Sequence, residues 1–183
     1  MALCHREVVD PVEHFTQQVF IKYLAAEPVE AGGGKALIRL DPKPQHLNHN
    51  GTVNAAVIYG LSEVTGAGAV VAEMLELAAE AYTVVKNATI DFLAPATGVL
   101  PATGRTDMGV LQAAKEQLAN GQAVEVEAAV AVTEEQGKEV ATVPACLHRL
   151  RSICVTPESV NGPRGPIHKV CAEARGWAAR TRK

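Results

Sequence analysis

The longest apolar stretch of the chain begins near residue 53 and predicts its central element. From there to residue 72, Ala, Val, Ile and Leu fall on every side of a helix, a pattern typical of a helix that other structure encloses. Charged residues become frequent after residue 72, so the helix, predicted over 53–79, is expected to reach solvent at its far end. The stretch contains Glu63 and many small residues, which favours a buried helix over a membrane span.

Three glycines lie inside this predicted helix, at positions 60, 66 and 68. Each lowers the stability of a helix by about 1 kcal/mol relative to alanine. A helix tolerates this loss where another part of the backbone must come close. We therefore expect close packing against the helix at Gly60, Gly66 and Gly68.

After the helix, apolar residues recur at every second position, the period of a half-buried strand. The alternation is clearest over 123–133, where Val or Ala occupies each inward position. Strands are predicted over 82–92, 99–106, 123–133 and 140–150, with a short helix over 110–119 and a hairpin turn at 134–137.

Before the central helix the pattern predicts one helix and one strand. Residues 11–26 read as an amphipathic helix, with Asp10 as N-cap and Pro11 in the first turn. Its predicted apolar face consists of Val12, Phe15, Val19 and Tyr23. A turn at 31–34, a strand over 35–40 and an irregular loop over 41–51 follow.

The order of elements is therefore strand, long buried helix, then four strands joined by short links. This order predicts an α+β fold in which an antiparallel sheet of five to six strands wraps one long central helix. We assign residues 1–152 to this single domain, N-terminal helix included. Residues 153–183 form a basic C-terminal tail, since residues 149–183 hold eight Lys or Arg against two Glu.

Composition excludes some classes of function and location. Aromatic residues make up only 4% of the chain and the net charge is -3, which disfavours a nucleic-acid partner. The four cysteines include no closely spaced pair, and no apolar run follows the charged N-terminus. These features predict reduced thiols, no membrane association and a cytoplasmic location.

Glu63 stands out as a candidate for chemistry. It lies in the middle of the apolar helix, where a buried carboxylate is costly unless it is paired. Burial raises the pKa of such a group and suits it to act as a base or nucleophile near neutral pH. The alternative is a structural glutamate bonded to the backbone or to water.

The loop before the helix adds a second candidate. Free N–H groups and a positive dipole end occur at a helix N-terminus, and a thioester carbonyl that becomes an oxyanion suits such a site. The small side chains of Ala55 and Ala56 would let a ligand approach the backbone.

Two motifs here resemble the signatures of hotdog-fold acyl-CoA thioesterases. The first is Asn48-x-x-Gly51-Thr52-x-Asn54-Ala55-Ala56, followed by six residues and then Glu63. Members of the phenylacetate-degradation and 4-hydroxybenzoyl-CoA type have Asn-x-x-Gly-x-x-His-Gly-Gly and an acid at this spacing. The second is the stretch 89–98, which is similar to the family's second strand. With Asn-Ala-Ala in place of His-Gly-Gly, the chain is most similar to thioesterase-like domains that carry an Asn-His-x-Gly-Thr loop.

This resemblance implies roles for individual residues. Glu63 would be the general base or nucleophile, and the Ala55 N–H would polarise the thioester carbonyl. Asn48 would orient the water or the carbonyl. Substrate contacts are expected from Asn54, Gly51, His49, Gly60 and Lys86. No metal or cofactor is implied, because coenzyme A is part of the substrate.

The spacing of the two catalytic candidates predicts an assembly. Ala55 and Glu63 are eight residues apart, about 12 Å along one helix, so one thioester carbon cannot contact both. Two antiparallel helices related by a two-fold axis would bring Ala55 of one copy to Glu63 of the other. We expect a homodimer, and the resembled family also forms dimers of dimers.

The predicted function is hydrolysis of an acyl-CoA thioester to the free acid and coenzyme A. The alternative is a hotdog dimer that binds acyl-CoA without turnover, and Glu63 separates the two because a mere binder has no need to bury it. A hydratase or dehydratase is the third possibility; it typically needs a His with an acid, and no His lies on the predicted central helix. Cys146 and His148 share one face of a predicted strand, and we interpret Cys146 as part of the core.

Overall fold

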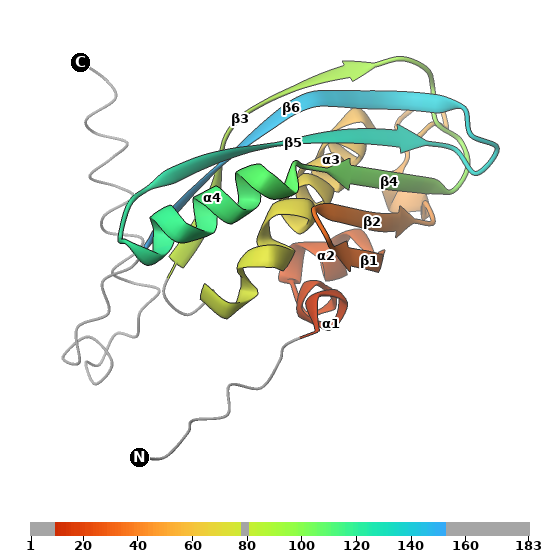
Figure 1. Ribbon diagram of the computed structural model, residues 1–183. Helices are drawn as coiled ribbons and strands as arrows, with labels where there is room; N and C mark the ends of the chain where they lie inside the picture. The colour runs from red at the N-terminus through yellow and green to blue at the C-terminus, as the bar shows by residue number, and fades with distance from the viewer. Residues whose placement is uncertain (1–9, 78–80, 153–183) are drawn as a thin grey trace, which may run out of the picture.

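The fold is a six-stranded antiparallel sheet wrapped around one long helix (Figure 1). The computed structural model describes residues 10–77 and 81–152. The strand order is β1-β2-β4-β5-β6-β3, which confirms the predicted α+β class. The strands are β1 (Ala26–Gly32), β2 (Lys35–Leu40), β3 (Ala81–Phe92), β4 (Leu100–Arg105), β5 (Val124–Thr133) and β6 (Glu139–Ser152). The helices are α1 (Pro11–Thr16), α2 (Val19–Leu24), α3 (Ala55–Val71) and α4 (Met108–Ala119), with 3-10 turns η1 (Pro44–His46) and η2 (Ala72–Leu77).

The central helix α3 is buried as predicted, and its last turns differ in type. It begins where the Asn54 side chain caps the Ala56 N–H, and it changes to the 3-10 segment η2 after Val71. Buried Ser62 and Thr65 donate to the carbonyl oxygens of Ile58 and Leu61, one turn earlier. The helix is long and apolar enough to cross a membrane, but 61% of its most apolar window is buried inside the fold. The sheet therefore covers this helix.

The prediction of a single helix over 11–26 is wrong. Gln18 adopts an extended conformation, with φ -63° and ψ 132°, and it separates α1 from α2. Val19 and Tyr23, expected on the buried face, are 83% and 78% exposed, whereas Ile21 and Leu24 are buried. The break turns α2 relative to α1, so apolar residues spaced at helical intervals across Gln18 do not share one face.

Strand β1 was not predicted, and its sequence explains why. It contains Glu27, Pro28 and Glu30, and proline occurs in sheets at edge strands, where no ladder partner is lost. Among the described residues, β1 is an edge strand that pairs with β2 alone. The two join at Gly33 and Gly34, whose positive φ values of 60° and 70° suit a tight hairpin turn.

Two hydrophobic clusters fill the fold. The larger lies between the first half of α3 and the sheet, and includes Ile58 and Leu61. The smaller lies between α4, the end of α3 and the adjoining parts of β5 and β6. Its members are Val70, Met74, Leu111, Ala114, Leu118, Val124, Val126, Ala128 and Leu150. In Figure 1, α4 lies under β5 on the side of the sheet that holds α3.

The helix and the sheet come closest at two glycines. A Cβ atom on Gly68 would lie 2.9 Å from the Cβ of Ala36, and one on Gly104 of β4 would lie 2.7 Å from the Thr65 carbonyl oxygen. Close approach at Gly68 confirms the expectation from the sequence. Gly104 makes the same kind of contact from the strand side.

Replacing Gly104 by alanine is expected to destabilise the protein by about 1–3 kcal/mol, because the helix backbone must move to admit the methyl group. Gly98→Ala is the matched control, since its Cβ would meet nothing within 4 Å. Chemical denaturation measures both free energies of unfolding. Equal denaturation midpoints for the two variants would show that α3 and β4 can move apart to admit the methyl group without loss of stability.

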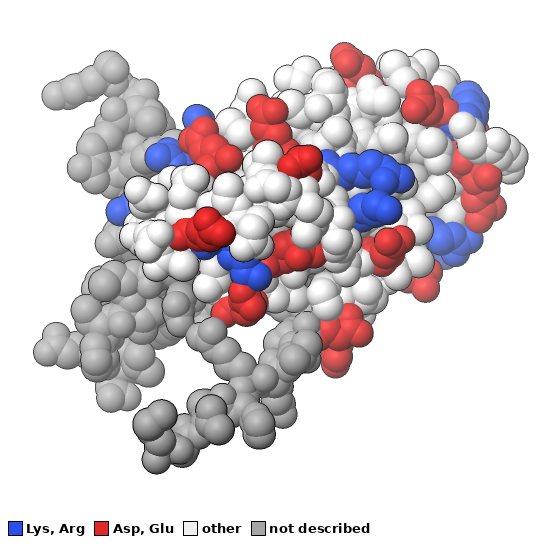
Figure 2. Space-filling model, in the orientation of Figure 1, with Lys and Arg blue, Asp and Glu red and all other residues white. Residues whose placement is uncertain are grey.

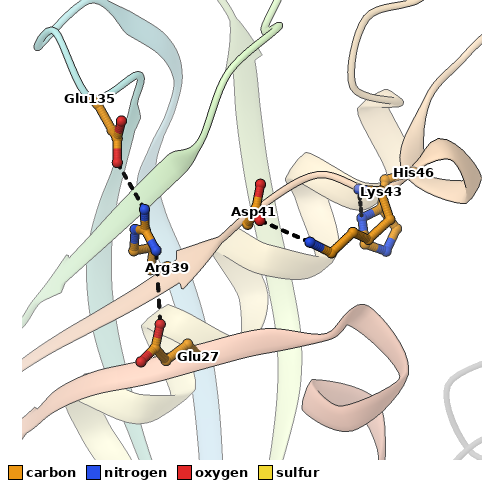
Figure 3. Close-up of polar contacts among 6 residues, drawn as sticks. All are labelled: Glu27, Arg39, Asp41, Lys43, His46 and Glu135. Carbon is orange, nitrogen blue, oxygen red and sulfur yellow. Dashed lines mark hydrogen bonds and ion pairs between the residues drawn. The ribbon is translucent and has the colours of Figure 1, made fainter.

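Charges of both signs alternate over the face shown in Figure 2, and no continuous basic patch forms there among the described residues. One polar group links three segments of the sheet: the Arg39 guanidinium donates to Glu135 at 2.9 Å and lies 4.0 Å from Glu27 (Figure 3). These groups are largely exposed, so each pair contributes little stability. The basic tail predicted over 153–183 lies outside the described residues.

Candidate functional site

The loop that leads into α3 is held by the side chain of Asn48. Its amide oxygen accepts from the N–H groups of Asn50 and Thr52, and its amide nitrogen donates to the Thr52 hydroxyl at 2.9 Å. Gly51 has a φ of 74° and donates to the Asn48 carbonyl. The Asn48 amide therefore makes its hydrogen bonds within the loop and holds the loop in shape.

A second set of contacts fixes where this loop starts. The Lys43 N–H donates to Nδ1 of buried His46 at 3.0 Å, and the Lys43 ammonium pairs with Asp41 (Figure 3). The His46 carbonyl accepts from the Asn54 N–H at 2.8 Å. The entry of the chain into α3 is thus tied to the turn η1.

The first turn of α3 presents one free backbone donor. Asn54 is the N-cap, and its side-chain oxygen accepts from the Ala56 N–H at 2.9 Å. Among the described residues, the Ala55 N–H has no acceptor. Ala55 and Asn48 line a cavity of about 340 Å³ that segment 92–96 closes on the other side. A polar group of a ligand can therefore reach the Ala55 N–H at the positive end of the helix dipole.

Glu63 lies at a second cavity, two turns further along α3. This cavity has a volume of about 190 Å³ and is lined by His14 and Gln18 from the N-terminal segment, Glu63 from α3, Thr83 from β3 and His148 from β6, among others. Burial raises the pKa of Glu63 above its usual value of 4.5. No hydrogen bond or ion pair to another described residue opposes this effect.

His148 is the functional candidate that the sequence analysis did not select. It points inward from β6, is completely buried, and has no partner for either ring nitrogen among the described residues. Burial lowers its pKa to about 4, so the imidazole is neutral near pH 7. The strand alternation already placed it inward beside Cys146, but only the structure brings β6 against the helix face that carries Glu63.

Buried Cys146 contacts the same region without joining the cavity lining. Burial and the nearby Glu63 carboxylate raise the pKa of its thiol to about 11. The thiol is therefore protonated near pH 7 and is a poor nucleophile, in keeping with its interpretation as a core residue.

The structure places the remaining predicted substrate contacts apart. The space beside Gly60 holds the Phe20 ring, whose nearest atom lies 2.9 Å from where a Cβ would be. Lys86 is on the outer side of β3, where its ammonium bonds both oxygens of Glu125 at 2.8 Å. His49 is exposed on the loop. Asn54 and Gly51 lie in the same loop as His49, beside the residues that line the Ala55 cavity.

The described residues include no group of three or more His, Cys, Asp or Glu side chains that could hold a metal ion. Of the two histidines that lie three residues apart in this loop, His46 is buried and accepts from the Lys43 N–H through Nδ1, whereas His49 is exposed.

Residues 23–148 of the chain match the family described as Domain of unknown function (DUF4442). The chain belongs to the DUF4442 family. No protein of curated function matches its sequence.

The DUF4442 protein shares its fold with solved proteins, some of which are named as thioesterases or probable thioesterases. A probable thioesterase of unknown function from Pseudomonas aeruginosa, PA5026, is 22% identical with a TM-score of 0.64, over 78% of this chain and 93% of that one. Thioesterase HI1161 from Haemophilus influenzae is 12% identical with a TM-score of 0.63, over 82% and 97%. The PaaI protein of the E. coli phenylacetic acid degradation operon is 17% identical with a TM-score of 0.57, over 79% and 91%. The DUF4442 protein therefore has the hotdog fold, which confirms the fold predicted from the sequence.

Proposed function

We propose that this DUF4442 protein hydrolyses an acyl-CoA thioester to the free acid and coenzyme A, at sites shared by two copies of the chain. The observation that carries the proposal is the Glu63 carboxylate, which has no partner among the described residues, opens to a cavity and has a raised pKa. An ion-pair network or a structural hydrogen bond would instead have lowered that pKa. The likeness to proteins named thioesterases supports the same chemistry.

The reaction needs a base and an oxyanion site. Glu63 takes a proton from water as the water oxygen attacks the thioester carbon. The carbonyl oxygen becomes negative and is stabilised by the Ala55 N–H at the helix N-terminus. The carbon–sulfur bond then breaks, and the coenzyme A thiolate takes the proton from Glu63. A carboxylate in this position also suits direct attack, which gives a mixed anhydride that water then cleaves.

One chain cannot supply both groups to one substrate. The cavities of Ala55 and Glu63 share no lining residue, and the two positions are about 12 Å apart along α3. β3 is the last strand of the sheet and pairs only with β6 among the described residues. Its free edge is a template for pairing with a second copy, which would place two α3 helices antiparallel beneath one continuous sheet.

The test is release of free thiol from short, medium, long-chain and aryl acyl-CoA. Turnover of at least one substrate supports the proposal and identifies the acyl class. If no substrate is cleaved but one of them raises the melting temperature, as a ligand of the folded state does, the protein is an acyl-CoA-binding dimer.

Mixing two inactive variants is expected to restore activity if the sites are shared. In a dimer of one Glu63→Gln chain and one Ala55→Pro chain, one site keeps both intact groups and the other has neither. Random reassociation of equal amounts would recover about a quarter of the wild-type activity, because half of the dimers are mixed and each has one good site. Thiol release before and after reassociation measures this. No recovery, with mixed dimers shown by native mass spectrometry, would place both groups of a site in one chain.

A further inference from the structure

The proposed reaction leaves one polar group in the Glu63 cavity without a role. His148 is completely buried, and neither ring nitrogen has a partner among the described residues. Leaving a buried donor or acceptor unsatisfied costs about 1–3 kcal/mol. An apolar side chain at this position of β6 would avoid that loss, so the presence of a polar imidazole there points to a role.

The helix makes room for this ring. A Cβ atom on Gly66 would lie 3.3 Å from Nε2 of His148 and 3.6 Å from the Cβ of Cys146. Gly66 is three residues after Glu63, so both lie on the same side of α3. The imidazole therefore lies against the helix at Gly66, where a larger residue would press on it, and it shares the lining of the cavity with Glu63.

Three locally unfavourable features meet at this one cavity. They are a glycine in mid-helix and, within the described part of the chain, a carboxylate and an imidazole that each have no partner. A cavity of about 190 Å³ has room for several water molecules. Water between Glu63 and His148 would give a hydrogen bond to each of the two groups.

The protonation states fit an arrangement around water. Among the described residues, the titratable groups that face His148 are His14 from α1, Glu63 from α3 and Cys146 from its own strand. The pKa of His148 is lowered to about 4, so the ring is neutral and has one donor and one acceptor nitrogen. Glu63, with its raised pKa, is the better base of the two.

We propose that His148 binds the attacking water together with Glu63. One O–H of the water points to the Glu63 carboxylate and the other to the unprotonated ring nitrogen of His148, which leaves a lone pair of the water oxygen free to attack the thioester carbon. Only Glu63 receives a proton, and the imidazole stays neutral throughout. This role rests on the proposed thioesterase function and adds a water-binding residue to it.

Kinetics of two substitutions test the role. His148→Met keeps a side chain of similar size whose sulfur is only a weak hydrogen-bond acceptor. His148→Gln keeps an amide near the position of Nε2. We expect His148→Met to lower kcat about tenfold or more with KM changed less than about twofold, and to raise the pH of the acidic limb of kcat, because Glu63 loses its polar neighbour. His148→Gln should recover much of the rate. Leu150→Met, on the same inward face of β6 but in the other cluster, is the control for packing.

Two results would overturn the role. One is a His148→Met enzyme with wild-type kcat and acidic limb. The other is a His148→Gln enzyme as impaired as His148→Met, which would mean that ring shape and not hydrogen bonding matters. If His148→Met does not fold, Gly66→Ala takes its place, since the added methyl must shift the imidazole while the helix itself gains stability.

A measurement without turnover separates this inference from the proposed function. Long-range 1H–15N spectra of the histidine rings, recorded for wild type and Glu63→Gln, should show His148 neutral down to about pH 5, below the ordinary histidine pKa, and should show its shifts moved by the substitution. Unmoved shifts would mean that the two groups share no water, and the inference fails. If wild type cleaves no acyl-CoA, the thioesterase proposal fails, and these spectra alone decide whether His148 and Glu63 form one site.

Discussion

Replacing Glu63 by glutamine is expected to lower thiol release by about 100-fold or more, the loss of one positioned acid–base group. The amide fills the same space and cannot take a proton from water. The measurement is kcat on the best substrate of the acyl-CoA panel. Glu116→Gln, on the exposed side of α4, is the control for the same chemical change away from the cavities.

Stability distinguishes this loss from misfolding. Because burial raises the pKa of Glu63 in the folded protein, folding favours the protonated form. Its contribution to stability is therefore fully present below the ordinary pKa and is lost as the pH rises through the raised value. At pH 7 the glutamine variant should unfold at the same or a higher temperature than wild type. Full turnover by the Glu63→Gln protein would show that Glu63 is a structural residue and not the catalytic base.

Replacing Ala55 by proline is expected to lower kcat by about 100- to 1000-fold, the effect of removing one oxyanion donor. Proline has no N–H, and position 55 is the first residue of α3, where proline is well accepted. Asn54 already has the extended conformation that precedes proline, with φ -62° and ψ 138°. The substitution should therefore delete the donor and leave the helix intact.

Ala55→Gly is the matched control, because it changes the side chain and keeps the N–H. It should retain most of the activity, and circular dichroism should show equal helix content in both variants. If the proline variant turns over acyl-CoA at the wild-type rate, the carbonyl oxygen is stabilised by some other group.

Most elements were predictable from the sequence because their patterns are local. The all-round apolar stretch identified α3, and strict alternation identified β5 and its partner β6. The edge strand β1 was not predicted because Pro28 and two glutamates weaken the strand signal. Pairing with β2 and packing against the helices stabilise it. The break at Gln18 was not predicted because the apolar residues of the two short helices together match the spacing of one continuous helix.

The site was predictable in part, for a different reason. Glu63 and Ala55 stood out as a charge and a helix start on one element, and the structure places each at a cavity. The contact between His148 and the face of α3 that carries Glu63 depends on how β6 crosses α3. Local sequence patterns do not predict that crossing. Only the charge of Lys86 suggests that it contacts substrate. The orientation of β3 turns its side chain outward, where it pairs with Glu125.

The division of the interior into two clusters bears on how such a protein can change over evolution. Two groups destabilise the fold, a carboxylate and an imidazole that have no partner among the described residues, and both lie at the middle of α3. The cluster under α4 contains only aliphatic side chains and one methionine. Natural proteins sit close to the stability they need, so a mutation that gains function is often lost through unfolding. A reserve of stability held away from the chemistry lets the residues around Glu63 vary, and with them the acyl groups accepted, while the domain stays folded.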